Sequence, residues 1–187
     1  KEGAHSYPRI LRARGDSTGK EIEETLIKMV KENPNIRVFE HAFALDLLVS
    51  KNTCNGIIAW RNRGGNTLIW AKQTILASGG CGQVYRETTN PEISTGDGIA
   101  MAYRAGIKLQ DLEFVQFHPT TLYVAGAERV LISETVRGEG GVLINKFGER
   151  FMPKYHSSAE LAPRDVVSRS VIQEIRKTDY THVYLDV

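Results

Sequence analysis

The chain has 187 residues, of which 24 are Lys or Arg and 22 are Asp or Glu, so its formal net charge is +2. This near-balance excludes a strongly basic nucleic-acid binder, because phosphate contacts need a surplus of cations. Hydrophobic residues make up 41% and charged residues 25%, which is typical of a folded protein. No apolar run approaches the ~18 residues of a membrane span, and two cysteines form neither a disulfide framework nor a zinc motif. We therefore expect a cytoplasmic chain with no nucleic-acid or membrane partner.

The first predicted helix begins at Thr18 and stops at Pro34. Thr18 and Glu21 have the spacing of a capping box, in which each side chain satisfies a backbone N–H of the other residue. The apolar residues that follow recur with helical spacing and predict one apolar stripe: Ile22, Leu26, Met29 and Val30.

Strands are expected next, in the apolar and β-branched runs 36–38, 42–49, 56–60, 67–70 and 74–77. The composition of residues 63–66, Arg-Gly-Gly-Asn, predicts a hairpin turn between two of these strands. The last run ends at a Ser-Gly-Gly segment, so the end of that strand carries only small side chains.

The second half predicts a short helix over 97–106, with Asp97 as its N-cap and Gly106 as its stop. A longer helix is expected over 163–177, with Pro163 in its first turn, and the end of the chain is strand-like. Glycine, proline and charge alternate irregularly after residue 112, and this change predicts a domain boundary there.

Four places could carry chemistry. Gly79-Gly80-Cys81-Gly82 lacks the G-x-G-x-x-G spacing, so its glycines indicate close backbone approach either to a ligand or to a neighbouring strand. His118 lies in a polar stretch and is either a structural side chain or part of a polar pocket. Ser133 is not in the G-x-S-x-G elbow of a hydrolase. The glycines of the polar segment 137–141 instead indicate a tight loop that holds charged side chains near a ligand. Arg164 stands at the positive end of a helix dipole, which is unfavourable for a cation. Either Asp165 neutralises it, or it serves as a fixed cation for a bound dicarboxylate.

Several segments resemble, in order and spacing, the flavoprotein family of succinate dehydrogenase, fumarate reductase and L-aspartate oxidase. They are 76–80 (LASGG), 89–91 (TNP), 95–98 (TGDG), 113–120 (EFVQFHPT), 137–140 (RGEG) and 149–152 (ERFM). Two further segments, 2–11 and 160–167, most resemble the L-aspartate oxidase branch. Succinate dehydrogenases usually carry Thr-Glu where this chain has Ser133-Glu134.

The resemblance implies an α/β (α+β) fold. Residues 1–112 would be part of a Rossmann-like FAD-binding domain, and residues 113–187 would begin an α+β capping domain. The family's N-terminal G-x-G-x-x-G and its later substrate-binding segment are absent, so we expect an internal fragment that is inactive by itself.

The implied function is FAD-dependent oxidation of L-aspartate to iminosuccinate, with FAD bound non-covalently and with oxygen or fumarate as acceptor. The product would feed quinolinate and NAD synthesis, which implies a functional link to quinolinate synthase. Two alternatives stay open: a flavoprotein segment of succinate dehydrogenase or fumarate reductase, and a folded module that binds no flavin.

The resemblance also implies roles for single residues. Arg164 matches the catalytic arginine, and Glu2 matches the acid that faces the substrate ammonium. The other substrate-pocket positions are His118, Ser133 and Glu134. The positions at the flavin or adenine side are Phe43, Ala44, Ala77, Ser78, Gly79, Gly80 and Asp97.

Overall fold

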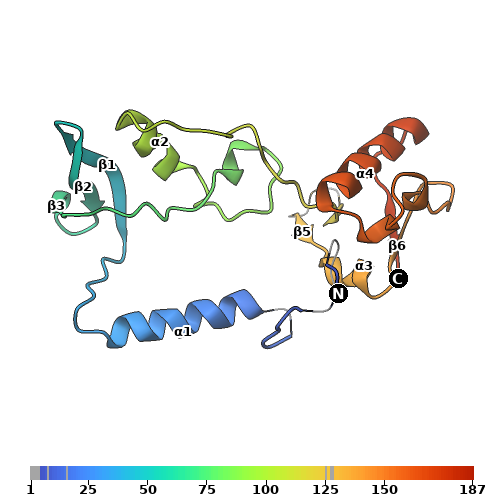
Figure 1. Cartoon of the computed structure of the whole chain (residues 1–187), viewed down its shortest axis with the longest axis horizontal. Coiled ribbons are helices and arrows are strands. Elements are labelled where there is room, and N and C mark those ends of the chain that lie inside the picture. The colour runs from blue at the N-terminus through green and yellow to red at the C-terminus, as the bar shows by residue number, and fades with distance from the viewer. Residues whose placement is uncertain (1–4, 8, 16, 125, 127–128) are drawn as a thin grey trace. The chain divides into compact units, whose positions relative to one another are not determined.

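The computed structural model describes residues 5–7, 9–15, 17–124, 126 and 129–187. The chain divides into two compact units, whose elements are labelled in Figure 1. The sheet unit comprises residues 12–86 and 90–112. The α4 unit comprises residues 1–11, 87–89 and 113–187, and takes its name from the helix α4 (Arg164–Thr178). Their assignment to an FAD-binding domain and a capping domain stays a prediction.

The first helix of the sheet unit, α1 (Thr18–Glu32), confirms the predicted helix but not its predicted cap. Thr18 is the first helical residue rather than the N-cap, and its hydroxyl accepts a hydrogen bond from the backbone N–H of Ala13 at 3.1 Å. The prediction of a capping box is therefore wrong. Arg14 instead pairs with Glu21 in the first turn, with 2.7 Å between Nε and Oε2.

The apolar stripe of α1 packs against nothing that buries it within the described chain. No residue of α1 is buried, and Ile22 and Leu26 are each 55% exposed. The periodicity thus predicted the helix correctly, although burial of the stripe does not accompany it.

An antiparallel sheet follows, formed in the order β1 (Ala42–Ser50), β2 (Thr53–Arg61), β3 (Gly65–Trp70). The predicted turn between β2 and β3 is confirmed. Gly56 allows a close approach between these strands, because a Cβ there would lie 2.0 Å from the carbonyl oxygen of Ile69.

Two predicted strands, 36–38 and 74–77, do not form. A strand needs a neighbour to complete its hydrogen-bond ladder, and neither run pairs with another segment in the described part of the chain. Ile75 is accordingly 89% exposed.

The helix α2 (Asp97–Arg104) confirms the short helix, but its N-cap is Gly96 and not Asp97. Gly106 does end it, with φ of 79°. Its N–H donates to the Tyr103 carbonyl at 2.9 Å, and the next N–H donates to the Ala102 carbonyl at 3.1 Å. These two bonds form a Schellman motif.

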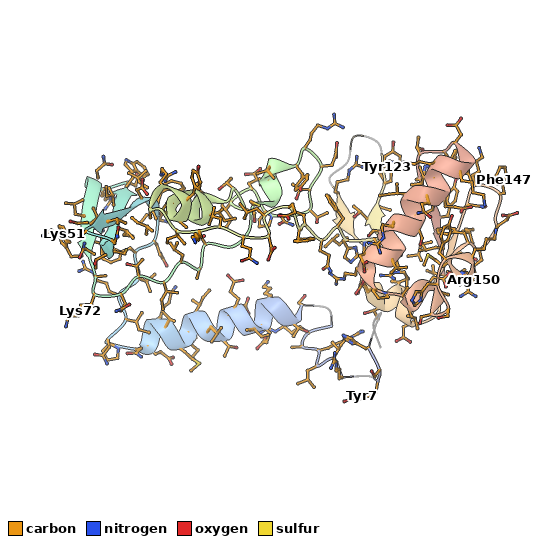
Figure 2. All side chains as sticks on the ribbon, turned by 45° about the horizontal axis from the view of Figure 1, so that its top comes forward. Tyr7, Lys51, Lys72, Tyr123, Phe147 and Arg150 are labelled. Atoms are coloured by element: carbon orange, nitrogen blue, oxygen red, sulfur yellow. The ribbon has the colours of Figure 1, made fainter. Side chains whose placement is uncertain are left out.

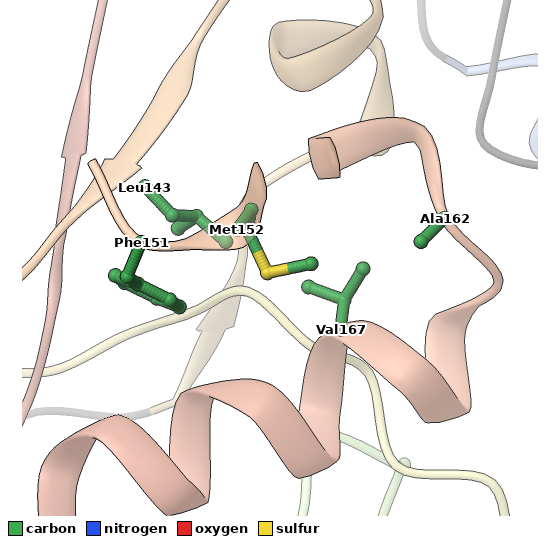
Figure 3. Close-up of a cluster of buried hydrophobic side chains, with 5 residues drawn as sticks. All are labelled: Leu143, Phe151, Met152, Ala162 and Val167. Atoms are coloured by element: carbon green, nitrogen blue, oxygen red, sulfur yellow. The ribbon is translucent and has the colours of Figure 1, made fainter. Parts of the chain in front are cut away.

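The α4 unit has a dense apolar core between α4 and the segments before it. Figure 3 shows its five buried side chains: Leu143, Phe151, Met152, Ala162 and Val167. The predicted helix over 163–177 is confirmed as α4, with Pro163 as the residue that precedes it. The strand-like end is also confirmed, since β7 (Tyr184–Asp186) pairs antiparallel with β6 (Val142–Ile144).

The remaining elements are short. In the α4 unit they are β4 (Thr121–Leu122), β5 (Val130–Leu131), α3 (Glu134–Gly138) and the 3-10 turns η2 (Met152–Lys154) and η3 (Ala159–Leu161). The sheet unit holds the 3-10 turn η1 (Gly82–Val84).

Candidate functional site

Arg164, the first residue of α4, is held by two other segments of the α4 unit. Its Nε lies 3.0 Å from Oε1 of Glu134 and its terminal nitrogen 3.2 Å from Oε2, which makes a two-pronged ion pair. Its other terminal nitrogen lies 3.3 Å from Oε1 of Gln116. The alternative prediction, that Asp165 neutralises Arg164, is wrong, because the Asp165 carboxylate pairs with Arg169 at 2.6 Å. The side chain of Arg164 stays 40% exposed, so it is fixed and still accessible.

Glu134 joins Arg164 to a second arginine. It is the first residue of α3 and is buried, and its Oε1 also accepts a bond of 2.8 Å from Arg137, one helical turn away. Burial opposes ionisation of Glu134, but the hydrogen bonds and charges of Arg164 and Arg137 outweigh it and lower its pKa. The carboxylate therefore stays ionised.

Arg137 belongs to the segment 137–141, for which the sequence predicts a tight loop that holds charged side chains near a ligand, although it predicts no separate role for Arg137. Its side chain is only 1% exposed, and it donates to the backbone carbonyl of Glu160 at 2.5 Å. Its Nε has no hydrogen-bond partner within the described chain. The three-residue spacing between Glu134 and Arg137 was the available signal, since such pairs meet on one helix face.

His118 lies half-buried near this cluster. Its Nδ1 is 3.0 Å from the carbonyl oxygen of Thr120 and 3.3 Å from the Thr120 nitrogen. Burial, together with the charges of Arg164 and Arg137, lowers the pKa of His118, against the opposing effects of the Thr120 backbone and Glu134. The ring is therefore neutral at pH 7 and offers one donor and one acceptor.

Ser133 and Glu2 complete the predicted substrate positions. The Ser133 side chain caps α3 by accepting from the Thr135 N–H at 3.3 Å, so its visible role is to begin the helix that carries Glu134. Glu2 lies outside the described residues.

The cluster of Arg164, Glu134 and Arg137 carries two positive charges and one negative charge. A surplus cation that is fixed by hydrogen bonds and accessible to solvent suits a carboxylate ligand, because the guanidinium fork matches carboxylate geometry. The structure thus brings together Arg164 and Glu134 and places His118 within their electrostatic reach.

The predicted cofactor positions belong to the sheet unit, and two of their segments meet. The hydroxyl of Ser78 lies 1.8 Å from where a Cβ on Gly98 would be, so Ser78 lies against the first turn of α2, which Asp97 begins. Gly79, with φ of 74°, and Gly80 have open space where a Cβ would stand.

These residues fit an extended nucleotide cofactor such as FAD. The glycine backbone is exposed for close approach, and the Asp97 carboxylate, which bonds to Thr95, is an acceptor suited to sugar or ribityl hydroxyls. Ala77 is exposed beside the glycines. Phe43 and Ala44 lie on β1, where their strand partners are Trp60 and Ala59, and no described contact joins them to the Ser78 segment.

No cluster of three or more metal-ligating side chains occurs among the described residues. In the same part of the chain, every helix is too short or too polar to cross a membrane.

Known flavoproteins resemble this chain in sequence and in fold. The model of the FAD binding domain family matches residues 1–187. The L-aspartate oxidase of Nostoc sp. is 50% identical over the whole chain, and L-aspartate oxidase 1 of Ralstonia nicotianae is 47% identical over the whole chain. The solved E. coli quinol fumarate reductase is 37% identical, covers 92% of the chain and superposes with a TM-score of 0.86.

The chain spans about a third of these relatives: 33% of the Nostoc protein, 36% of the Ralstonia protein and 32% of the E. coli chain. The predicted mixed fold, the cofactor FAD and the family resemblance are confirmed. The chain belongs to the FAD binding domain family of flavoproteins, within which it resembles the L-aspartate oxidases and the fumarate reductases.

Proposed function

We propose that the protein carrying this chain oxidises L-aspartate to iminosuccinate. In this reaction the substrate loses its Cα hydrogen with the bonding electrons and one proton from nitrogen, and a C=N bond forms. Bound FAD supplies the two-electron acceptor, and oxygen or fumarate takes the electrons onward. A non-covalent flavin, a cytoplasmic location and a functional link to quinolinate synthase belong to the same proposal.

The observation that carries the proposal is the two-pronged pairing of Glu134 with Arg164. It fixes the plane of the guanidinium while part of the group stays accessible. A fixed cation binds a substrate carboxylate and stabilises negative charge that develops beside it. His118, which is neutral, adds a hydrogen bond without a second charge. The higher identity to the L-aspartate oxidases than to the E. coli fumarate reductase favours aspartate as the substrate.

Arg164→Lys tests this role in the protein expressed from its full coding sequence. Lysine keeps the charge but loses the planar fork, so we expect flavin content to stay and anaerobic bleaching of the flavin by L-aspartate to slow at least tenfold. Arg169→Lys, on the same helix and paired only with Asp165 among the described residues, is the matched control. Equal bleaching rates in the two variants would remove Arg164 from the reaction.

A second candidate is a succinate dehydrogenase or fumarate reductase flavoprotein, because the E. coli fumarate reductase shares the fold. Bleaching by succinate instead of L-aspartate would favour it, as would flavin that stays with the pellet after acid precipitation, since that indicates a covalent link. A protein without flavin would support the third hypothesis, a folded module.

A further inference from the structure

We infer that Glu160 is a positioning residue that fixes the positions of Arg137, Glu134 and Arg164, although its carboxylate contacts none of the predicted substrate residues that the structure describes. The inference rests on the proposed function, because it concerns the same candidate site. Glu160 is a buried charged residue to which the proposed function assigns no role.

The Glu160 carboxylate is buried and fully engaged. The residue is 3% exposed, and its Oε1 accepts from the Leu143 N–H at 3.2 Å and from Nε of Arg150 at 3.0 Å. A terminal nitrogen of Arg150 lies 2.6 Å from its Oε2. These bonds join the 3-10 turn η3 to strand β6 and fix the Glu160 backbone in place.

The backbone carbonyl of Glu160 is the acceptor that Arg137 uses. Arg137 in turn bonds to Glu134, which holds Arg164 on both oxygens. A buried guanidinium that loses an acceptor is left partly uncompensated, which is strongly unfavourable. A shift of the Glu160 carbonyl would therefore move Arg137 and the Glu134 carboxylate with it.

The same residue also controls Arg164 through the chain. Only three residues separate them, of which Ala162 is 1% exposed and Pro163 has restricted backbone freedom. We call Glu160 and its bonds to Leu143 and Arg150 the Glu160 clamp. This clamp affects the position of Arg164 in two ways, through the short backbone connection and through the Arg137–Glu134 pair.

Arg150 is the partly exposed member of the Glu160 clamp, so the clamp can be changed by a substitution at the surface. It is 50% exposed, and Figure 2 labels it on the α4 unit. A change there alters the clamp without removing a buried group, so it is less disruptive to folding than a change at Glu160.

Glu174 provides a matched control in the same unit. It is 1% exposed, and its carboxylate accepts from Asn145 at 2.9 Å and from the Tyr155 hydroxyl at 2.8 Å. Neither partner bonds to Arg137, Glu134 or Arg164 in the described structure. A purely structural role for Glu160 predicts that the two buried glutamates behave alike.

The test compares Glu160→Gln and Glu174→Gln in the flavin-loaded protein of full coding length. We expect both to lower the melting temperature. Glu160→Gln alone should reduce kcat with L-aspartate by about tenfold to a hundredfold, since a displacement of about 1 Å costs on the order of a hundredfold. Its KM should change less than kcat. Arg150→Met should show a smaller loss than Glu160→Gln, and Arg150→Lys should recover part of it.

A second measurement does not depend on turnover. Hydrogen–deuterium exchange followed by mass spectrometry should show faster exchange over 133–139 and 163–167 in Glu160→Gln but not in Glu174→Gln. Equal kcat losses in the two variants, or unchanged exchange in these segments, would overturn the positioning role. If the wild type lacks L-aspartate activity, the proposed function fails while the exchange comparison still decides the inference.

Discussion

The α4 unit and the sheet unit bury their apolar side chains to different degrees. In the α4 unit, Phe151, Met152 and Val167 are completely buried, whereas Ile22 and Leu26 of α1 are more than half exposed. The two long helices, α1 and α4, both carry apolar side chains at helical spacing. Periodicity therefore identifies a helix, while its burial depends on whether the described chain also supplies a partner for the apolar face.

The largest expected effect is in the α4 core. Phe151→Ala removes a fully buried ring that makes an edge contact with Tyr155. We expect the free energy of unfolding to fall by about 3–5 kcal/mol, as measured by urea titration of the chain with circular dichroism. A loss below about 1 kcal/mol would mean that this core is not packed in solution.

Gly56→Ala should be the most damaging single change in the sheet unit. A Cβ there would meet the Ile69 carbonyl, and the residue has φ of 140°, which side chains rarely adopt. We expect a loss of about 1–3 kcal/mol or more, read from faster amide exchange in β2 and β3. Gly64→Ala, which meets nothing within 4 Å but also has positive φ, separates backbone strain from the clash. Equal effects would show that the clash is relieved.

Acid should destabilise the α4 unit before the sheet unit. Glu134 and Glu160 are buried, and in each case hydrogen bonds and charges from arginines outweigh burial and lower the pKa below its ordinary value of 4.5. Because their pKa values are lower in the folded state, their stabilisation is present above about pH 4.5 and is lost as the pH falls through the folded values. Amide exchange compared at pH 6 and pH 4, corrected for intrinsic rates, should show the loss first in α3 and α4. A uniform loss over both units would contradict it.

The smallest effect is expected on the exposed face of α1. Leu26→Ser should change the free energy of unfolding of the chain by about 0.5 kcal/mol or less, because exposed substitutions remove little buried area. The urea titration used for Phe151→Ala measures it directly. A loss near 2 kcal/mol would show that α1 is packed in solution.

Local signals predicted the elements whose stabilising contacts are local. The spacing of apolar residues predicted α1, Pro163 indicated the first turn of α4, and the glycines at 63–66 predicted the β2–β3 turn. The strand expected over 74–77 failed because a strand depends on a partner elsewhere in the chain. The capping box failed because Thr18 had a competing donor at Ala13.

The candidate site was predicted only in part, for a similar reason. Family resemblance gave Arg164 and Glu134, whose pairing over 30 positions no spacing rule predicts. The contact of Arg137 with Glu160 was not predicted because it joins a side chain to a backbone carbonyl 23 positions away. The cofactor and substrate roles of single residues stay predictions.

The contact between α2 and β1 has a consequence for the order of assembly. Arg104 bonds to Asp46 at 2.9 Å across 58 positions, and Ser78–Gly80 and Asp97 lie within the loop that this contact closes. Loop-closure entropy grows with length, and contacts distant in sequence form more slowly than hairpins. We therefore expect the three-stranded sheet to form first and the glycine-rich segment to acquire its final conformation late, so that flavin capture follows sheet formation during folding.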